Sequence, residues 1–133
     1  MNTEVFSPEL FQKYCPGKTK TLGQKNLFKA LEKAVAILGP GRVYSILVGG
    51  LEPFDSLSKG LNFLADIGVT PVINVFHADP KTPLEGFPTP KPDEILYMGK
   101  LLQEVYAVNT YMSPFYRECG RNSLDSEAYM KLF

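Results

Sequence analysis

Three short segments of the sequence carry side chains that could bind a ligand or assist a reaction. They are residues 2–4, which read Asn-Thr-Glu, the turn at 48–53 with paired glycines and Glu52, and the segment 76–80 with His77 and Asp79. Glycine lets a backbone approach a ligand closely because no Cβ intervenes. A carboxylate accepts hydrogen bonds from sugar hydroxyls or from amines. These segments are therefore the candidates for a binding site.

Each candidate also has a simpler structural explanation. The paired glycines can form a tight turn, and Glu52 can cap the helix that follows it. His77 is the single histidine, and no serine or cysteine is placed to use it as a base, so a catalytic triad is not favoured. Glu4, Glu52 and Asp79 would form a carboxylate pair or a metal site only if folding brought them together. The dinucleotide-binding fingerprint and the phosphate-binding loop are both absent from the sequence.

Alternating strands and helices are expected to position these segments. Apolar residues recur at helical spacing over residues 24–38, and two short, continuously apolar runs are typical of buried parallel strands. The predicted elements are a strand end at 2–6, helices at 8–14, 24–38, 55–68 and 92–109, and strands at 43–48 and 70–76. Asp55 is expected to cap its helix, the helix at 8–14 is expected to stop at Pro16-Gly17, and residues after Ser113 are left unassigned.

This order of elements predicts an α/β protein with parallel strands and right-handed crossovers. In such sheets functional groups gather at the carboxyl ends of the strands, which is where the three candidate segments fall. The connection at residues 77–91 holds four prolines and is longer than a routine connection. Long connections of this kind are often functional.

Composition excludes several classes of protein. The chain has 133 residues, 14 basic and 14 acidic side chains, and 44% apolar residues, which is typical of one globular domain. A balanced charge argues against nucleic acid as a partner, and no apolar run is long enough to span a bilayer, so we expect a cytoplasmic protein without a membrane partner. Lys18, Lys20 and Lys25, like Arg117 and Arg121, are expected to form solvated basic groups. The aromatic residues are expected to serve as core or lid, and these include Phe6, Phe11, Tyr14, Phe115 and Tyr116.

The combination of motifs is more specific than its parts. Residues 45–52, Ser-Ile-Leu-Val-Gly-Gly-Leu-Glu, resemble the GxIxGxxE motif on the fifth strand of radical S-adenosylmethionine (radical SAM) enzymes, with serine for the first glycine and leucine for isoleucine. Residues 72–77 and Thr82-Pro83-Leu84 are similar to the sixth strand and the Gly-Thr-Pro-Leu loop of biotin-synthase-like members, with Lys81 in place of the glycine. Residues 2–4, 8–10 and 19–22 resemble the fourth strand and the segment after it. The resemblance covers nearly all of residues 1–108.

The resemblance implies roles for eight residues in binding S-adenosylmethionine. Glu4 would accept hydrogen bonds from the ribose hydroxyls, and Asn2 would make a polar contact with cofactor or substrate. On the next strand, Leu47 would face the adenine, Gly49 would admit the backbone and Glu52 would order the turn. From the strand after it, Phe76 and His77 would flank the adenine while Asn74 points into the barrel.

The resemblance also implies what this chain lacks. The family holds a [4Fe-4S] cluster with a CxxxCxxC motif, whereas this sequence contains only Cys15 and Cys119. We therefore expect residues 1–110 to be the C-terminal half of a (β/α) TIM-type barrel, with about three to four βα units, and residues 111–133 to be a tail. A full barrel of this type takes about 250 residues. The fragment alone is expected neither to assemble the cluster nor to cleave S-adenosylmethionine.

The implied partners follow from this partial barrel. They are a small-molecule substrate, the missing N-terminal half-barrel and other copies of the chain that associate through open sheet edges. Cys119 could ligate an auxiliary cluster in the whole enzyme, although an unpaired thiol is the simpler interpretation. The alternative function is a non-catalytic α/β module that binds a nucleotide or a partner protein.

Overall fold

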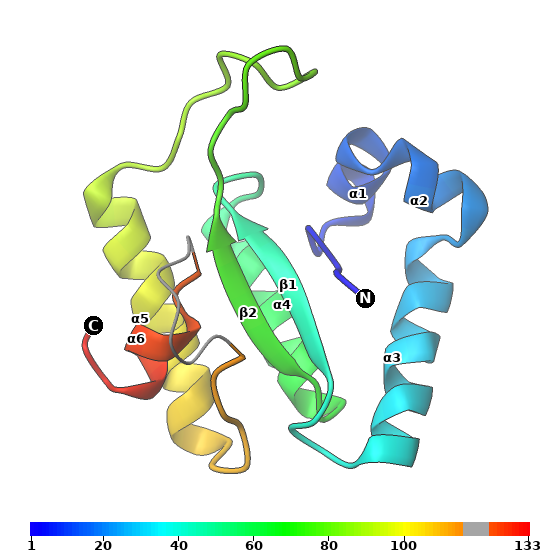
Figure 1. Cartoon of the computed structure of the whole chain (residues 1–133), viewed down its shortest axis with the longest axis vertical. Helices are drawn as coiled ribbons and strands as arrows, with labels where there is room; N and C mark the ends of the chain where they lie inside the picture. Colours follow the sequence, from blue (N-terminus) through cyan, green and yellow to red (C-terminus); the bar gives the residue numbers. More distant parts are fainter. Residues whose placement is uncertain (116–122) are drawn as a thin grey trace.

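The computed structural model describes residues 1–115 and 123–133 (Figure 1). The chain begins with three helices, continues as two strands each followed by a helix, and ends with a short helix. The elements are α1 (Pro8–Tyr14), α2 (Pro16–Thr21), α3 (Gln24–Leu38), β1 (Tyr44–Gly49), α4 (Phe54–Asp66), β2 (Thr70–Val75), α5 (Pro92–Val108) and α6 (Asp125–Tyr129). The predicted α/β class is confirmed.

The sheet consists of two parallel strands with short additions on either side. β1 and β2 pair in register from Tyr44 with Thr70 to Gly49 with Val75. Glu4 makes a parallel bridge to Leu47 beside β1, and Ser123 makes an antiparallel bridge to Asn74 beside β2. Two parallel strands fit both a barrel segment and an open sheet, so the partial barrel stays a prediction.

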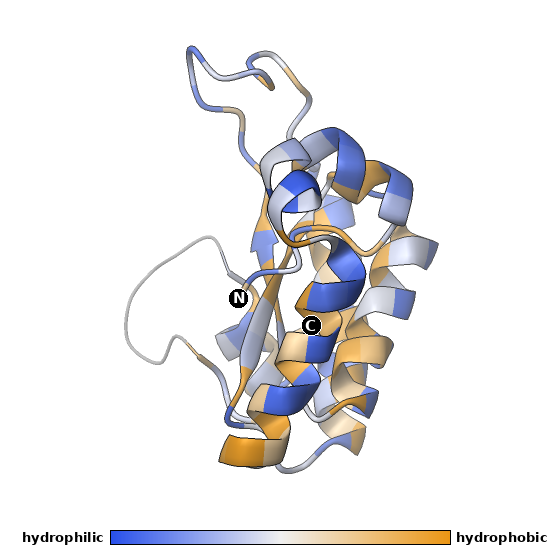
Figure 2. Ribbon diagram, turned by 90° about the vertical axis from the view of Figure 1, so that its right-hand side faces the viewer, coloured by the Kyte–Doolittle hydropathy of each residue, from blue (hydrophilic) through white to orange (hydrophobic). Residues whose placement is uncertain are grey.

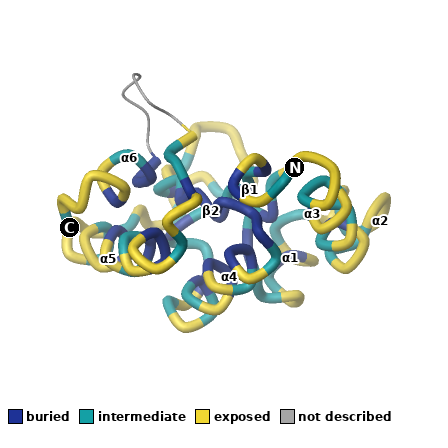
Figure 3. Tube along the Cα trace, turned by 90° about the horizontal axis from the view of Figure 1, so that it is seen from below, coloured by how far each residue is buried: buried dark blue, intermediate teal, exposed yellow. Residues whose placement is uncertain are grey.

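The core lies between one face of this sheet and the helices. Leu47 and Ile73 are both fully buried there, together with leucines of α4 and with Met98 and Leu102 of α5. Viewed along the strands, α4 lies under the strand pair, with α3 on the side of β1 and α5 on the side of β2 (Figure 3). Side chains alternate along a strand, so one face of β1 belongs to this core and the other face does not.

Local sequence signals account for most element boundaries. The predicted helix over residues 24–38 is confirmed in full, and it ends at Gly39, whose φ of 93° is a conformation that glycine adopts readily. The helix predicted from Pro92 ends at Val108, within a residue of its expected end. Its first turn carries Asp93 and Glu94, which suit the positive end of the helix dipole.

One expectation about the helices was wrong, and two helices were not expected. The helix predicted at residues 8–14 ends at Tyr14 as expected, but Pro16 begins a further helix, α2, because proline is well tolerated in a first helical turn. Asp55 lies within the first turn of α4 and Pro53 precedes the helix, so Asp55 is not its cap. Residues 125–129 of the tail form α6, which packs on α5. Among the described residues, no helix is both long enough and apolar enough to cross a membrane.

On each side of the sheet, backbone carbonyl oxygens accept hydrogen bonds from other parts of the chain. The Gln24 side chain donates hydrogen bonds to the carbonyl oxygens of Val5 and Phe6, each at 3.0 Å. On the far side of the sheet, the backbone N–H of Leu124 donates to the carbonyl oxygen of Ile73 at 2.9 Å. Edge groups that are already paired are less available to another chain. Association through the sheet edges stays a prediction.

Candidate functional site

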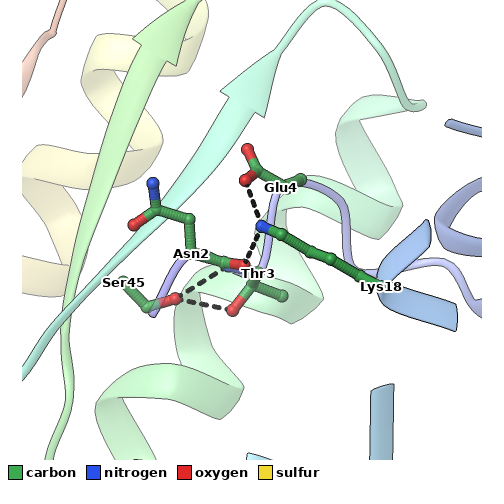
Figure 4. Close-up of polar contacts among 5 residues, drawn as sticks. All are labelled: Asn2, Thr3, Glu4, Lys18 and Ser45. Carbon is green, nitrogen blue, oxygen red and sulfur yellow. Dashed lines mark hydrogen bonds and ion pairs between the residues drawn. The ribbon is translucent and has the colours of Figure 1, made fainter. Parts of the chain in front are cut away.

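The first residues of the chain are held against β1 by a buried pair of hydroxyl groups. Thr3 and Ser45 are both fully buried, and their side-chain oxygens lie 2.6 Å apart. The Thr3 N–H also donates to Ser45 Oγ at 3.0 Å (Figure 4). Asn2 and Glu4 flank Thr3 in the chain, so their side chains are directed away from this buried pair.

Glu4 is fixed by an ion pair with Lys18 of α2. Lys18 Nζ lies 2.5 Å from Glu4 Oε1 and 3.1 Å from the carbonyl oxygen of Asn2 (Figure 4). The backbone of Glu4 has a φ of 65°, a left-handed conformation that is uncommon for residues other than glycine. Among residues 1–115 and 123–133, no partner is found for the second carboxylate oxygen of Glu4. This oxygen could accept a hydrogen bond from a ligand.

Glu52 joins the turn after β1 to the segment that leads into α1. Its side chain is buried, and its carboxylate accepts hydrogen bonds from Phe6 N at 2.8 Å and Ser7 N at 3.1 Å. It also accepts one from Ser56 Oγ at 2.5 Å, within the first turn of α4. These contacts use both oxygens, so the Glu52 carboxylate acts as an internal tie that orders two turns.

Leu47 and Gly49 face the helices. Leu47 is 0% exposed and belongs to the core. A Cβ on Gly49 would lie 2.4 Å from the sulfur of Met98 and 2.9 Å from Cγ2 of Ile73. Glycine is therefore required at residue 49 by the packing of α5 on the strand. A ligand on the opposite face of the sheet would meet the backbone of β1 but not the Leu47 side chain, because alternate residues project to opposite faces.

Asn74 lies on that opposite face. It pairs in register with Val48, whereas its chain neighbour Ile73 pairs with Leu47 and faces the core. Its side-chain oxygen Oδ1 is buried and, among the described residues, has no hydrogen-bond partner. An unpaired buried polar group costs about 1–3 kcal/mol. A donor supplied by a ligand would remove this cost.

A cavity of about 410 Å³ opens beyond the carboxyl end of β2. One wall comes from the end of α1 and the start of α2, with Lys13, Tyr14 and Pro16, and the other wall includes Phe76, His77 and Leu84. His77 Nδ1 lies 3.4 Å from Asp79 Oδ1, and both side chains are largely exposed. The size and the mixture of apolar, aromatic and polar lining groups are typical of small-molecule sites.

Cys15 connects the cavity to the Glu4–Lys18 pair. It lies between the lining residues Tyr14 and Pro16 in the chain. Burial raises the pKa of its thiol, the negative charge of Glu4 raises it further, and the positive charge of Lys18 opposes both effects. The Glu4–Lys18 ion pair therefore lies close enough to Cys15 to influence the pKa of its thiol. Phe76 and His77 line the cavity, whereas the Leu47 side chain lies in the core and Gly49 faces α5.

The sequence offered little sign of two residues in this region. Lys18 was expected to be a solvated charge, but its ammonium lies between two oxygens of the N-terminal segment. Tyr14 was expected to be core or lid, and it lines the cavity. The missing signal was the start of α2 at Pro16, which turns Lys18 back toward Glu4. The expectations for four residues of the tail lie outside the described residues, namely those for Tyr116, Arg117, Cys119 and Arg121.

The described residues do not fit an iron–sulfur cluster. No group of three or more His, Cys, Asp or Glu side chains among residues 1–115 and 123–133 could hold a metal ion. Cys15 is the one cysteine in the described part of the chain. A [4Fe-4S] cluster needs several thiolate ligands.

Comparison with known proteins gives one informative similarity. No family model matches the chain, and no solved structure matches it. The chain is 31% identical over 104 residues to the bacteriochlorophyllide c C-7(1)-hydroxylase of Chlorobaculum limnaeum. The aligned region is 77% of this chain but 26% of the hydroxylase, so the chain spans about a quarter of the length of that relative.

Proposed function

We propose that this chain forms the S-adenosylmethionine-contacting side of a radical SAM enzyme that removes a hydrogen atom from a small substrate. One observation carries the proposal. The 410 Å³ cavity lies at the carboxyl end of β2, lined by Phe76 and His77 on one side and by Tyr14 on the other. Aromatic side chains suit the base of an adenosine, and a carboxylate such as that of Glu4 suits the hydroxyls of its ribose, which donate hydrogen bonds.

The backbone of the 77–91 connection supports the resemblance to the biotin-synthase-like loop. Lys81 stands where that loop has glycine, and its φ is 64°. This left-handed conformation is the one that glycine adopts at least cost. Residue 81 thus has a conformation typical of glycine although it is a lysine. Lys81 N also donates to Glu85 Oε2 at 2.8 Å, which stabilises the turn.

The similarity to a hydroxylase supports the class of reaction. A hydroxylase that acts at a carbon position must first activate a C–H bond. Hydrogen-atom abstraction, which the radical SAM resemblance implies, activates such a bond. The substrate of this chain and the activity of the whole protein remain part of the proposal, because the chain spans about a quarter of that relative.

The residues of this chain would bind and orient the cofactor. When bound together with a cluster, S-adenosylmethionine supplies the radical that abstracts hydrogen. Glu4, held in place by Lys18, would accept a hydrogen bond from the ribose with its second oxygen. Phe76 would pack against the base, Asn2 would add a polar contact, and Asn74 Oδ1 would accept a hydrogen bond from a donor on cofactor or substrate. The described residues offer no set of cluster ligands.

Equilibrium titration of the 133-residue chain with S-adenosylhomocysteine tests the proposal. We expect saturable binding that Glu4→Ala weakens at least tenfold, because the ribose loses its acceptor and Lys18 loses its partner. Glu9→Ala is the matched control, since Glu9 is an exposed glutamate of α1. No binding by the unmodified chain, or equal binding by Glu4→Ala, would overturn the proposal. Iron and sulfide analysis and an assay for 5′-deoxyadenosine are expected to show neither a cluster nor turnover in this chain.

A further inference from the structure

The connection at residues 77–91 is organised as a unit of its own. Thr82 Oγ1 donates to the carbonyl oxygen of Asp79 at 2.8 Å, and Glu85 N donates to the carbonyl oxygen of Thr82 at 3.0 Å. Phe87 N then donates to the carbonyl oxygen of Leu84 at 2.9 Å. Within residues 1–115 and 123–133, all hydrogen bonds found for residues 77–90 join two members of this connection. Among the described residues, hydrogen bonds therefore shape residues 77–90 but do not attach them to the rest of the protein, and Lys91 alone joins the connection to the start of α5.

The connection projects beyond the ends of the strands. Two views at right angles both show it extending past the helices that flank the sheet (Figures 1 and 2). Its residues are mostly exposed, including Lys81 and Gly86. Such a segment needs a side-chain contact if it is to hold a fixed position over the cavity.

Phe87 provides that contact, because its ring meets both walls of the cavity. Its centroid lies 5.6 Å from that of Phe76 with an interplanar angle of 90°, and 6.4 Å from that of Tyr14 with an angle of 77°. Near-perpendicular ring pairs at these separations are favourable aromatic contacts. Phe76 continues from β2 and Tyr14 ends α1, so a single ring links the connection to two parts of the protein that are remote in sequence.

Gly86, the residue before Phe87, has a left-handed backbone conformation. Its φ is 78°, and a Cβ at this position would meet no atom within 4 Å. Glycine is therefore favoured here by the backbone turn and not by crowding. This turn directly precedes Phe87, whose ring contacts Tyr14 and Phe76.

We propose that Phe87 is a positioning residue that fixes the distance between the Tyr14 and Phe76 walls and holds the 77–91 connection over a flat ligand bound between them. The proposal rests on the proposed function for the identity of the ligand, an adenosine-bearing molecule. The lining of the cavity gives the selectivity: a planar base contacts the aromatic and proline side chains, and its sugar extends toward Glu4. The Phe87 ring touches the walls and not the ligand, so its effect on binding is indirect.

Limited trypsin digestion tests the attachment of the connection directly. Lys81 is exposed and open to trypsin, whereas Lys91 precedes Pro92 and is therefore a poor site for trypsin. Cleavage after Lys81 gives two fragments that mass spectrometry identifies. We expect Phe87→Ala to speed this cleavage at least fivefold, with Phe87→Leu between the two, because leucine keeps apolar contact without the ring geometry. Tyr97→Ala is the matched control, since Tyr97 forms a ring pair with Phe54 away from the cavity.

Titration with S-adenosylhomocysteine then tests the effect on binding. We expect Phe87→Ala to weaken affinity about tenfold, and we expect the ligand to slow cleavage after Lys81 in the unmodified chain but not in this variant. Circular dichroism of each variant checks that the fold is retained. Equal cleavage and equal affinity for Phe87→Ala and the unmodified chain would overturn the positioning role. If the unmodified chain fails to bind the ligand, the proposed function fails, and faster cleavage of Phe87→Ala would still support the anchoring role of Phe87.

Discussion

Replacing Glu52 by alanine should reveal how strongly one buried carboxylate stabilises the fold. Glu52 is 7% exposed and accepts three hydrogen bonds, from two backbone N–H groups and one hydroxyl. The backbone donors belong to the segment that carries Glu4 into α1. Loss of the carboxylate should therefore destabilise the protein and loosen the N-terminal segment that borders the cavity.

The magnitude follows from the number and type of these bonds. A hydrogen bond to a charged group contributes about 1.5–3 kcal/mol, and the three share one acceptor group and are not additive. The donors are only partly buried, so water can replace part of the loss. We expect Glu52→Ala to lower the free energy of unfolding by about 3 kcal/mol. We expect Glu52→Gln to lower it by about half as much, because one amide oxygen still accepts while the amide NH₂ faces a donor.

Urea unfolding followed by circular dichroism measures this difference. Glu104→Ala is the matched control, since Glu104 is exposed on α5 and alanine suits a helix. A change of about 3 kcal/mol corresponds to a fall in Tm of about 10 °C for a domain of this size. A loss below about 0.5 kcal/mol, or a loss equal to that of Glu104→Ala, would refute the assignment of Glu52 as an internal tie.

Three further predictions follow from the packing and from the backbone. Gly49→Ala should lower the free energy of unfolding by about 1–3 kcal/mol in thermal unfolding, because its Cβ would collide with side chains of the core. At Gly17 an added Cβ would meet no atom within 4 Å, so Gly17→Ala should be neutral or stabilising. Lys81→Gly should raise the free energy of unfolding by about 0.5–1 kcal/mol, because it removes the conformational cost of a φ of 64° in a residue other than glycine. A lower free energy of unfolding would contradict this account. Burial raises the pKa of the Tyr106 hydroxyl above its usual value of about 10. The unfolded chain then releases this proton first as the pH rises, so stability should fall above about pH 10, and Tyr106→Phe should make that fall less steep in urea titrations at about pH 9–11.

The fold could be predicted from the sequence wherever local signals agree. The helix at 24–38 was predicted in full because its apolar stripe ends at a glycine with proline behind it. The signals failed where one residue type has two uses. Proline ends many helices but also begins them, which hid α2 at Pro16, and Asp55 suits both a cap and a first turn. The tail helix α6 is short and packs on α5, so its own sequence gave little indication of it.

The site could be predicted only in part. The motif at residues 45–52 implied that Glu52 would order the turn, but it could not identify the donors Phe6 and Ser7, which lie 46 and 45 residues away in the chain. The same motif implied that Leu47 would face the adenine, and its side chain lies in the core. A one-residue difference along a strand reverses the face on which a side chain lies. Motif spacing does not carry this information.

The sequence by itself determined the α/β class, the main helices and the segments where polar residues would gather, because periodicity, glycines and prolines act locally. Tertiary structure alone decided how those segments meet. It placed Lys18 against Glu4, Glu52 against the turn into α1, and Phe87 between Tyr14 and Phe76. Each of these contacts joins residues that lie far apart in the chain or on separate elements. Their geometry depends on the packing of helices around two strands, which no local pattern specifies.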